Sequence, residues 1–233
     1  MDKLAEHVGL YDIWAIFFPG MIGTLENLLC IGSLCIIHSG DAFIKILAFI
    51  PSTISEWIVA MVSSIFFGLI YQEIGRLLKK VFKIKNAAKD LFNPKSGVFE
   101  ANEIAPLKRV LLKKDCNEQN AFHRINAEAQ EKGIASKYVK LSVIQNMSLS
   151  LAAVMLFGAT ESVAVMVFSF QNEAMDMVAA SISGTFLCIL LMIMFIKRSE
   201  RFNRYWVKNL IYAVAVSHTE TKTGGYEKPH EEN

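Results

Sequence analysis

The stretch FFPGMIGTLENLLCIGSLCII, from Phe17 to Ile37, decides the class of this protein. It is long and apolar enough to be a membrane-spanning helix, because about 20 helical residues cross a hydrocarbon core. Glu26 and Asn27 nevertheless stand near its middle. An ionised carboxyl at the centre of a bilayer costs about 2.5 to 3.5 kcal/mol on insertion scales, so Glu26 requires a proton, a polar partner or a wet cavity.

The remaining sequence has the same character. The chain has 233 residues, 53% of them hydrophobic, with a mean hydropathy of +0.34, and its apolar runs alternate with charged ones. Four runs are long enough to cross a membrane: 13–37, 54–74, 141–170 and 177–196. We therefore predict an all-α polytopic membrane protein with four transmembrane helices and a cytoplasmic helical insert between the second and third. The expected parts are a first transmembrane pair (1–75), the insert (76–140), a second transmembrane pair (141–197), an interfacial or cytoplasmic helix (198–216) and a disordered tail (217–233).

The distribution of positive charge predicts the orientation. Of the 24 Lys and Arg residues, 15 lie within 76–140 and seven follow the fourth span, whereas Lys45 is alone between the first two spans. An excess of Lys and Arg marks the cytoplasmic side of a membrane. We expect both termini in the cytoplasm of a bacterium, with the protein in its inner membrane. No cleavable signal peptide is expected at the N-terminus.

The insert is predicted to be helical throughout. A first helix would continue the second span as far as the NPKSG sequence at 93–97, because Pro and Gly are poor helix-interior residues. A second would start with Pro106 in its first turn, and a third would run from Asn117 to Gly133. So short a region forms only a small core, which favours homo-oligomerisation or a cytoplasmic protein partner docked on 76–140.

The positive charge of the insert permits two interpretations. It can follow from topology and attract anionic membrane lipids, or it can bind an anionic ligand such as a nucleotide. No nucleic-acid-binding motif is present, so we expect no direct contact with nucleic acid. The candidate residues for the partner, lipid or anion contacts are Arg76, Lys79, Lys80, Lys83, Lys85, Lys113 and Lys114.

Glu26 and Asn27 also permit two interpretations. They can join helices through hydrogen bonds, with Ser63 or Ser64 in the second span as partners. Alternatively, they can face a path for ions or protons, or a switch, at the axis of an oligomer. Glu161 is the second acidic candidate, and we expect it near the outer membrane boundary or at a pore mouth.

Small residues and one proline add candidates for helix packing and motion. Pro19 and Gly20 form a candidate hinge, because proline removes a helical hydrogen bond. Gly23 in the first span, with Ala180 and Gly184 in the fourth, would allow close approach of a neighbouring helix.

Sequence motifs for catalysis are missing from this chain. It contains no HExxH, Gly-x-Ser-x-Gly or phosphate-loop sequence, so we expect no enzyme activity. The four Cys and five His residues lack metal-ligand spacing, and we expect neither a metal nor a cofactor. The alternative is a small membrane enzyme or a transporter that acts on a lipid or a small molecule.

Two short motifs carry a resemblance. The opening YDIWAIFFPG (11–20) and the later KYVKLSVIQNMSLS (137–150), separated by a basic insert, resemble small four-span membrane proteins of bacterial antiphage defence. The membrane subunit of Kiwa-type systems is the nearest, and the membrane effectors of nucleotide-signalling systems are second. The resemblance implies an inner-membrane oligomer that senses membrane disturbance for a cytoplasmic partner or that perturbs the membrane itself.

Overall fold

The computed structural model describes residues 10–39, 53–84, 87–88, 91–94, 98–111 and 121–223. These residues form six α-helices and one short 3-10 helix, and no strand occurs among them. The helices are α2 (Leu10–Ser39), α4 (Ile54–Val81), α5 (Ala101–Leu111), α6 (Ala121–Glu131), η3 (Ala135–Lys137), α7 (Val139–Gln171) and α8 (Met175–Thr223).

Four of these helices, α2, α4, α7 and α8, are long and apolar enough to cross a membrane. The all-helical fold and the four candidate spans predicted from the sequence are therefore confirmed.

The chain divides into two compact units, which we describe separately. The span unit comprises residues 1–84 and 143–199, and the insert unit comprises residues 85–142 and 200–233.

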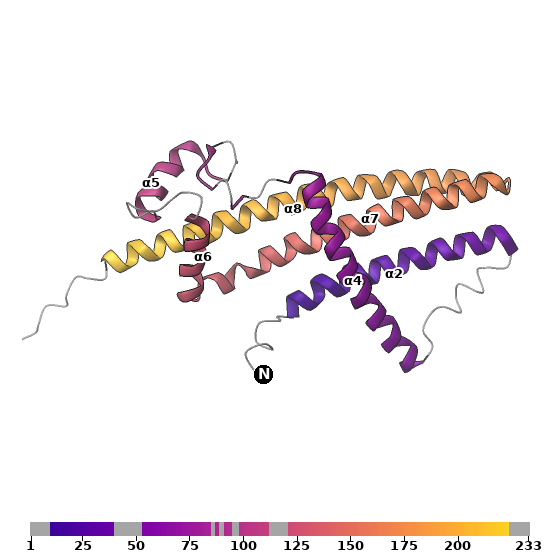
Figure 1. The fold of residues 1–233 in the computed structure, drawn as a ribbon, viewed down its shortest axis with the longest axis horizontal. Coiled ribbons are helices and arrows are strands. Elements are labelled where there is room, and N and C mark those ends of the chain that lie inside the picture. The colour runs from indigo at the N-terminus through magenta and orange to yellow at the C-terminus, as the bar shows by residue number, and fades with distance from the viewer. Residues whose placement is uncertain are drawn as a thin grey trace, which may run out of the picture. The chain divides into compact units, whose positions relative to one another are not determined.

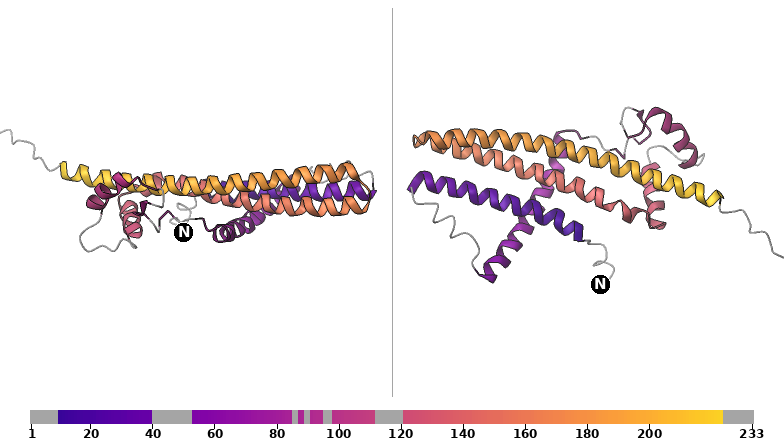
Figure 2. Two further views of the ribbon diagram at one scale, coloured as in Figure 1. Left: turned by 90° about the horizontal axis from the view of Figure 1, so that it is seen from above. Right: turned by 180° about the vertical axis from the view of Figure 1, so that it is seen from behind.

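Within the span unit, α2, α7 and the first part of α8 run alongside one another, and α4 crosses them obliquely (Figures 1 and 2). The helix α4 begins with a capping box, in which Thr53 Oγ1 accepts from the Glu56 amide and Glu56 Oε2 accepts from the Thr53 amide. These bonds satisfy two of the amides that every helix start leaves unpaired. The two middle turns of α4 then lie against α2.

The turn between α7 and α8 has three residues, Asn172 to Ala174. Glu173 has a φ of 58°, and the Ala174 amide donates to the Ser169 carbonyl at 3.0 Å, which closes the end of α7. The predicted spans 141–170 and 177–196 imply a short connection of this kind.

The insert unit has its own hydrophobic core, centred on the second part of α8. Val207, Leu210, Ile211 and Val214 are each at most 1% exposed, and their spacing of three or four residues puts them on one helix face. Buried residues of α5, of α6 and of the segment 87–99 pack against this face. The helix α8 continues through the polar sequence at 197–204, which contains no Pro or Gly and carries an ion pair between Glu200 and Arg204 at 3.0 Å.

This arrangement differs from the separate helix expected at 198–216. The residues of that interfacial or cytoplasmic helix form the second part of α8, and one face of it is buried in the core of the insert unit. The disordered tail expected from residue 217 is helical to Thr223, and residues 224–233 lie outside the described residues.

The helix boundaries in the insert also differ from those predicted. The helix α4 ends at Val81 instead of continuing to NPKSG, because Lys83 takes a left-handed conformation (φ 48°) and the Ile84 amide closes back on the Lys79 carbonyl at 3.1 Å. Pro106 lies inside α5 and not in its first turn, since the buried stripe of Ile104, Leu107 and Leu111 extends the helix on both sides of it.

The third predicted helix is partly confirmed. Gly133, with a φ of 67°, follows α6 as expected, and the Ile134 amide donates to the Ala129 carbonyl at 2.8 Å. The predicted start at Asn117 lies outside the described residues.

Candidate functional site: a pocket with two carboxylates

Glycines bring α2 and α4 into backbone contact. A Cβ atom added at Gly20 would overlap the Ser64 carbonyl oxygen, and one added at Gly68 would overlap the Ile16 carbonyl oxygen. We call Gly20, Gly23 and Gly68 the glycine crossing. No side chain fits between the two backbones at Gly20 and Gly68, and a side chain at Gly23 would overlap the Tyr71 ring, which is the reason that these positions carry glycine.

The glycine crossing clarifies the role of two predicted residues. Gly23 lies beneath the Tyr71 ring, as its assignment to helix packing requires. Gly20 is also a packing residue, and α2 runs through Pro19 as one helix from Leu10 to Ser39. Pro19 is less than 2% exposed, so the candidate hinge is tightly packed in this structure.

Asn27 is held by the same contact region. Its Nδ2 donates to the Gly23 carbonyl at 2.7 Å and to Tyr71 Oη at 3.4 Å. Asn27 therefore joins α2 to α4, as the interpretation of helix joining predicted, but its partner is Tyr71. Ser64, one of the two expected partners, donates instead to the Ala60 carbonyl of its own helix at 2.8 Å. Residue spacing alone does not tell how α4 is rotated against α2.

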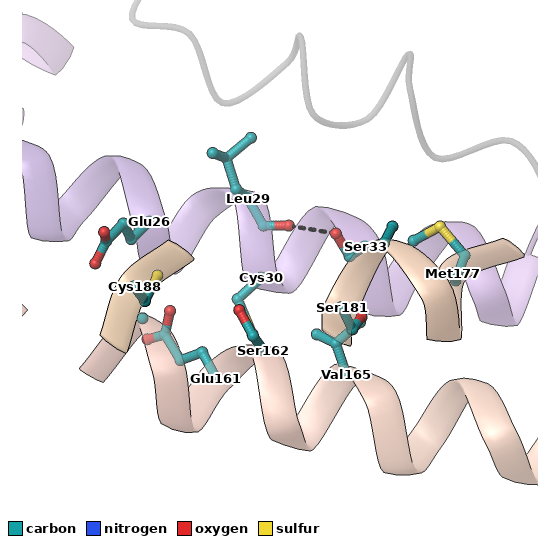
Figure 3. A pocket seen from close by; sticks show the side chains of 12 residues that line it. Glu26, Leu29, Cys30, Ser33, Glu161, Ser162, Val165, Met177, Ser181 and Cys188 are labelled. Carbon is teal, nitrogen blue, oxygen red and sulfur yellow. Dashed lines mark hydrogen bonds between the residues drawn. The ribbon is translucent and has the colours of Figure 1, made fainter. Parts of the chain in front are cut away.

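Glu26 lines a pocket of about 320 Å³ between α2, α7 and α8 (Figure 3). We call this the acid pocket. The described residues that line it are Glu26, Leu29, Cys30, Ser33, Gly158, Glu161, Ser162, Val165, Met177, Ala180, Ser181 and Cys188. Among these residues are two carboxylates, three hydroxyls and two thiols, and none of them is basic.

The Glu26 carboxylate lies over Gly158. A Cβ atom added there would be 2.9 Å from Glu26 Oε2 and 3.1 Å from Oε1, so glycine provides the space for the carboxylate. Oε2 is buried and has no hydrogen-bond partner among the described residues. The carboxyl is thus sheltered by protein without being neutralised by a donor, an arrangement that costs free energy unless a proton or a cation is present.

Glu161 lies in the acid pocket together with Glu26, and its position near the outer membrane boundary stays a prediction. The helix α7 has 33 residues, and Glu161 lies ten residues before its end at Gln171. At a rise of 1.5 Å per residue this distance is about 15 Å along the helix axis.

The remaining predicted packing residues also lie at or near the pocket. Ala180 lines it, and Gly184 is close to Ser162, whose Oγ would be 3.3 Å from a Cβ added at Gly184. Both therefore lie where helices of one chain meet, as close approach of a neighbouring helix requires.

Four of the seven basic candidates lie among the described residues. Arg76 pairs with Glu73 on its own helix, Lys79 is half-buried, and Lys80 and Lys83 are exposed. Lys85, Lys113 and Lys114 lie outside the described residues.

Sequence reasoning missed Gly158, Ser162, Ser181, Cys30 and Cys188 as pocket residues. One signal was available, because Gly158 precedes Glu161 by three residues and Cys30 follows Glu26 by four, which places each pair on one helix face. Such spacing within one helix does not show which faces of two different helices pack together. Within the described part of the chain, no three His, Cys, Asp or Glu side chains are grouped so that they could hold a metal ion.

The comparisons with known proteins add no identification. No protein-family model, no curated protein and no solved structure matches this chain. The site must therefore be interpreted from its own geometry.

The insert unit holds two polar clusters on α8. In the first, Tyr212 Oη donates to Glu103 Oε1 at 2.6 Å, and Lys208 Nζ lies 3.3 Å from Glu103 Oε2. The hydrogen bond from Tyr212, followed by that from the Glu100 amide and the contact with Lys208, lowers the pKa of the Glu103 carboxyl. These contacts attach α5 to α8.

The second cluster attaches α6 to α8. Lys132 Nζ donates to Glu128 Oε1 at 2.7 Å and to Ser217 Oγ at 3.1 Å, and His218 Nε2 is 2.7 Å from Glu128 Oε1. Burial raises the pKa of Glu128, but the contacts with Lys132 and His218 outweigh it and leave this pKa below its ordinary value.

Proposed function

We propose that this chain is a membrane sensor or conduction subunit in which the acid pocket binds a proton or a monovalent cation. The observation that supports the proposal is the meeting of Glu26 and Glu161, from two different helices, in one pocket whose described lining contains no basic side chain. Two carboxylates in a low-dielectric cavity cannot both be ionised at low cost, so occupancy by a positive charge is favoured. Carboxylate and hydroxyl oxygens suit such an occupant.

The wider setting in this proposal comes from the sequence. The basic insert predicts that both termini are cytoplasmic, and the resemblance of YDIWAIFFPG and of the four-span layout implies a homo-oligomer in a bacterial inner membrane that acts in antiphage defence. A change in membrane voltage or proton gradient would alter the occupancy of the acid pocket. The insert unit would pass this change to a cytoplasmic protein partner, or an oligomer would conduct ions through the membrane.

Flux measurements in proteoliposomes test the proposal. The purified protein is reconstituted, and H⁺, Na⁺ and K⁺ fluxes are measured under an imposed voltage or pH gradient. Glu26→Gln and Glu161→Gln keep the side-chain volume and remove the charge. Glu173→Gln, in the exposed turn between α7 and α8, is the matched control.

We expect the wild type to show flux or, in its absence, an increase in thermal stability when a cation is added or the pH is lowered. Glu26→Gln and Glu161→Gln should lose this response, and the Glu173→Gln control should retain it. If neither flux nor such a stability change depends on Glu26 or Glu161, the proposal is wrong. Loss of the flux or of the stability change in the Glu173→Gln control as well would also contradict it, because the response would then not arise in the pocket.

A further inference from the structure

The insert unit contains a second cavity, which shares no lining residue with the acid pocket. It has a volume of about 900 Å³ and lies between α5, α6 and α8. The described residues that line it are Arg109, Val110, Leu111, Arg124, Ile125, Ala127, Glu128, Glu131, Lys132 and His218. Three helices thus contribute basic side chains to one concave surface.

Some charged side chains of this cavity contact one another, and others have no such partner among the described residues. Glu128 already contacts both Lys132 and His218, so these three side chains largely neutralise one another. Arg109 and Arg124 come from different helices, and neither forms a hydrogen bond or an ion pair with any described residue. Glu131 is the one remaining carboxylate in the described lining.

We propose that the cavity between α5, α6 and α8 binds a phosphate-bearing anion through Arg109 and Arg124. A guanidinium group presents two parallel N–H donors that match phosphate oxygens, and two such groups that line one cavity from different helices can bind one phosphorylated group together. The apolar side chains of Val110, Leu111 and Ile125 line the same cavity and would contact the less polar part of the ligand. A free phosphorylated metabolite and a lipid headgroup share this chemistry.

The core of the insert unit supports the positions of both arginines. Leu111 and Ile125 are buried, and each lies within two residues of one of the arginines. The backbone that carries the guanidinium groups is therefore fixed by packing, although the arginine side chains themselves are exposed. The contact of His218 with Glu128 and the hydrogen bond from Lys132 to Ser217 hold the end of α6 against α8.

The test uses the full-length protein in nanodiscs of zwitterionic lipid, with pyrophosphate as the probe in isothermal titration calorimetry. We expect saturable binding that the double variant Arg109→Gln/Arg124→Gln weakens at least about tenfold, as the loss of charge-assisted hydrogen bonds implies. Glu131→Gln should strengthen binding, because it removes the opposing charge. Arg201→Gln, an exposed arginine of α8 outside the cavity, is the control and should bind as the wild type does.

A second set of nanodiscs, containing phosphatidic acid, distinguishes the two sources of the ligand. If the lipid competes with pyrophosphate in the wild type, the phosphate group that fits the cavity is a headgroup; if it does not, the ligand is soluble. Either result supports the site. Absence of saturable pyrophosphate binding, or equal weakening by Arg201→Gln, would overturn it.

Discussion

Substitution of the glycines in the crossing tests the packing of α2 on α4. A Cβ atom at Gly20 would lie 2.8 Å from the Gly68 amide nitrogen, and one at Gly68 would lie 2.8 Å from the Ile16 carbonyl carbon. Ordinary carbon contacts are about 3.5 to 4.0 Å, so each alanine must separate the helices by roughly 1 Å. Overpacking of this kind costs up to about 3 kcal/mol, and the better helix propensity of alanine returns up to about 1 kcal/mol. The expected net loss for Gly20→Ala or Gly68→Ala is about 2 kcal/mol.

The loss should not be additive. Once the first alanine has separated the helices, the second occupies space that already exists, so the double variant should lose clearly less than the sum of the single losses. The free energy of unfolding is measured by titration with SDS in mixed micelles, followed by tryptophan fluorescence.

Gly184→Ala serves as the control for this experiment. Its nearest neighbour would be Ser162 Oγ at 3.3 Å, a side-chain atom that can move, so we expect no loss of stability. Unchanged stability in Gly20→Ala and Gly68→Ala, or a loss in Gly184→Ala as large as theirs, would refute the close crossing.

Two further predictions concern the insert unit. Leu210 is 1% exposed, so Leu210→Ala should lower the free energy of unfolding by about 2 to 5 kcal/mol, as the loss of a buried leucine does. The control Tyr205→Ala, at an exposed position of the same helix, should lower it much less. Equal losses would contradict the buried face of α8. The pKa of Glu103 is lowered in the folded state, so its contacts stabilise the folded protein at pH values above the ordinary glutamate pKa. This stabilisation is lost as the pH falls below about 4.3. Thermal unfolding between pH 6 and 3 should therefore depend on pH less steeply in Glu103→Gln than in the wild type, and identical profiles would contradict the contact with Tyr212.

The sequence predicted those features that depend on one segment at a time. Hydrophobic length alone gave the four candidate spans, and Gly133 gave the end of α6, because a left-handed residue after a helix favours glycine. The requirement that Glu26 be sheltered by protein also followed from one residue and the cost of burying its charge.

Features that depend on which helix faces meet could not be predicted from the sequence. The partner of Asn27 is Tyr71, 44 residues away, and only the rotation set by the glycine crossing selects it over the serines of the same helix. Likewise, Glu161 joins Glu26 in one pocket because of the faces with which α2, α7 and α8 meet. The continuation of α8 past Arg198 was missed because a polar run resembles a boundary, although its later residues repeat with a buried helical period.

The central claim is that Glu26 and Glu161 share one pocket, and a double-mutant cycle measures this most directly. The free energies of unfolding of wild type, Glu26→Gln, Glu161→Gln and the double variant are compared at pH 9, far above the ordinary pKa of a glutamate of about 4.3. Each single substitution removes the repulsion between the two carboxylates, so the double variant should gain less than the sum, with a coupling of about 1 kcal/mol or more. Additivity within about 0.5 kcal/mol would show that the carboxylates do not interact and would contradict the account.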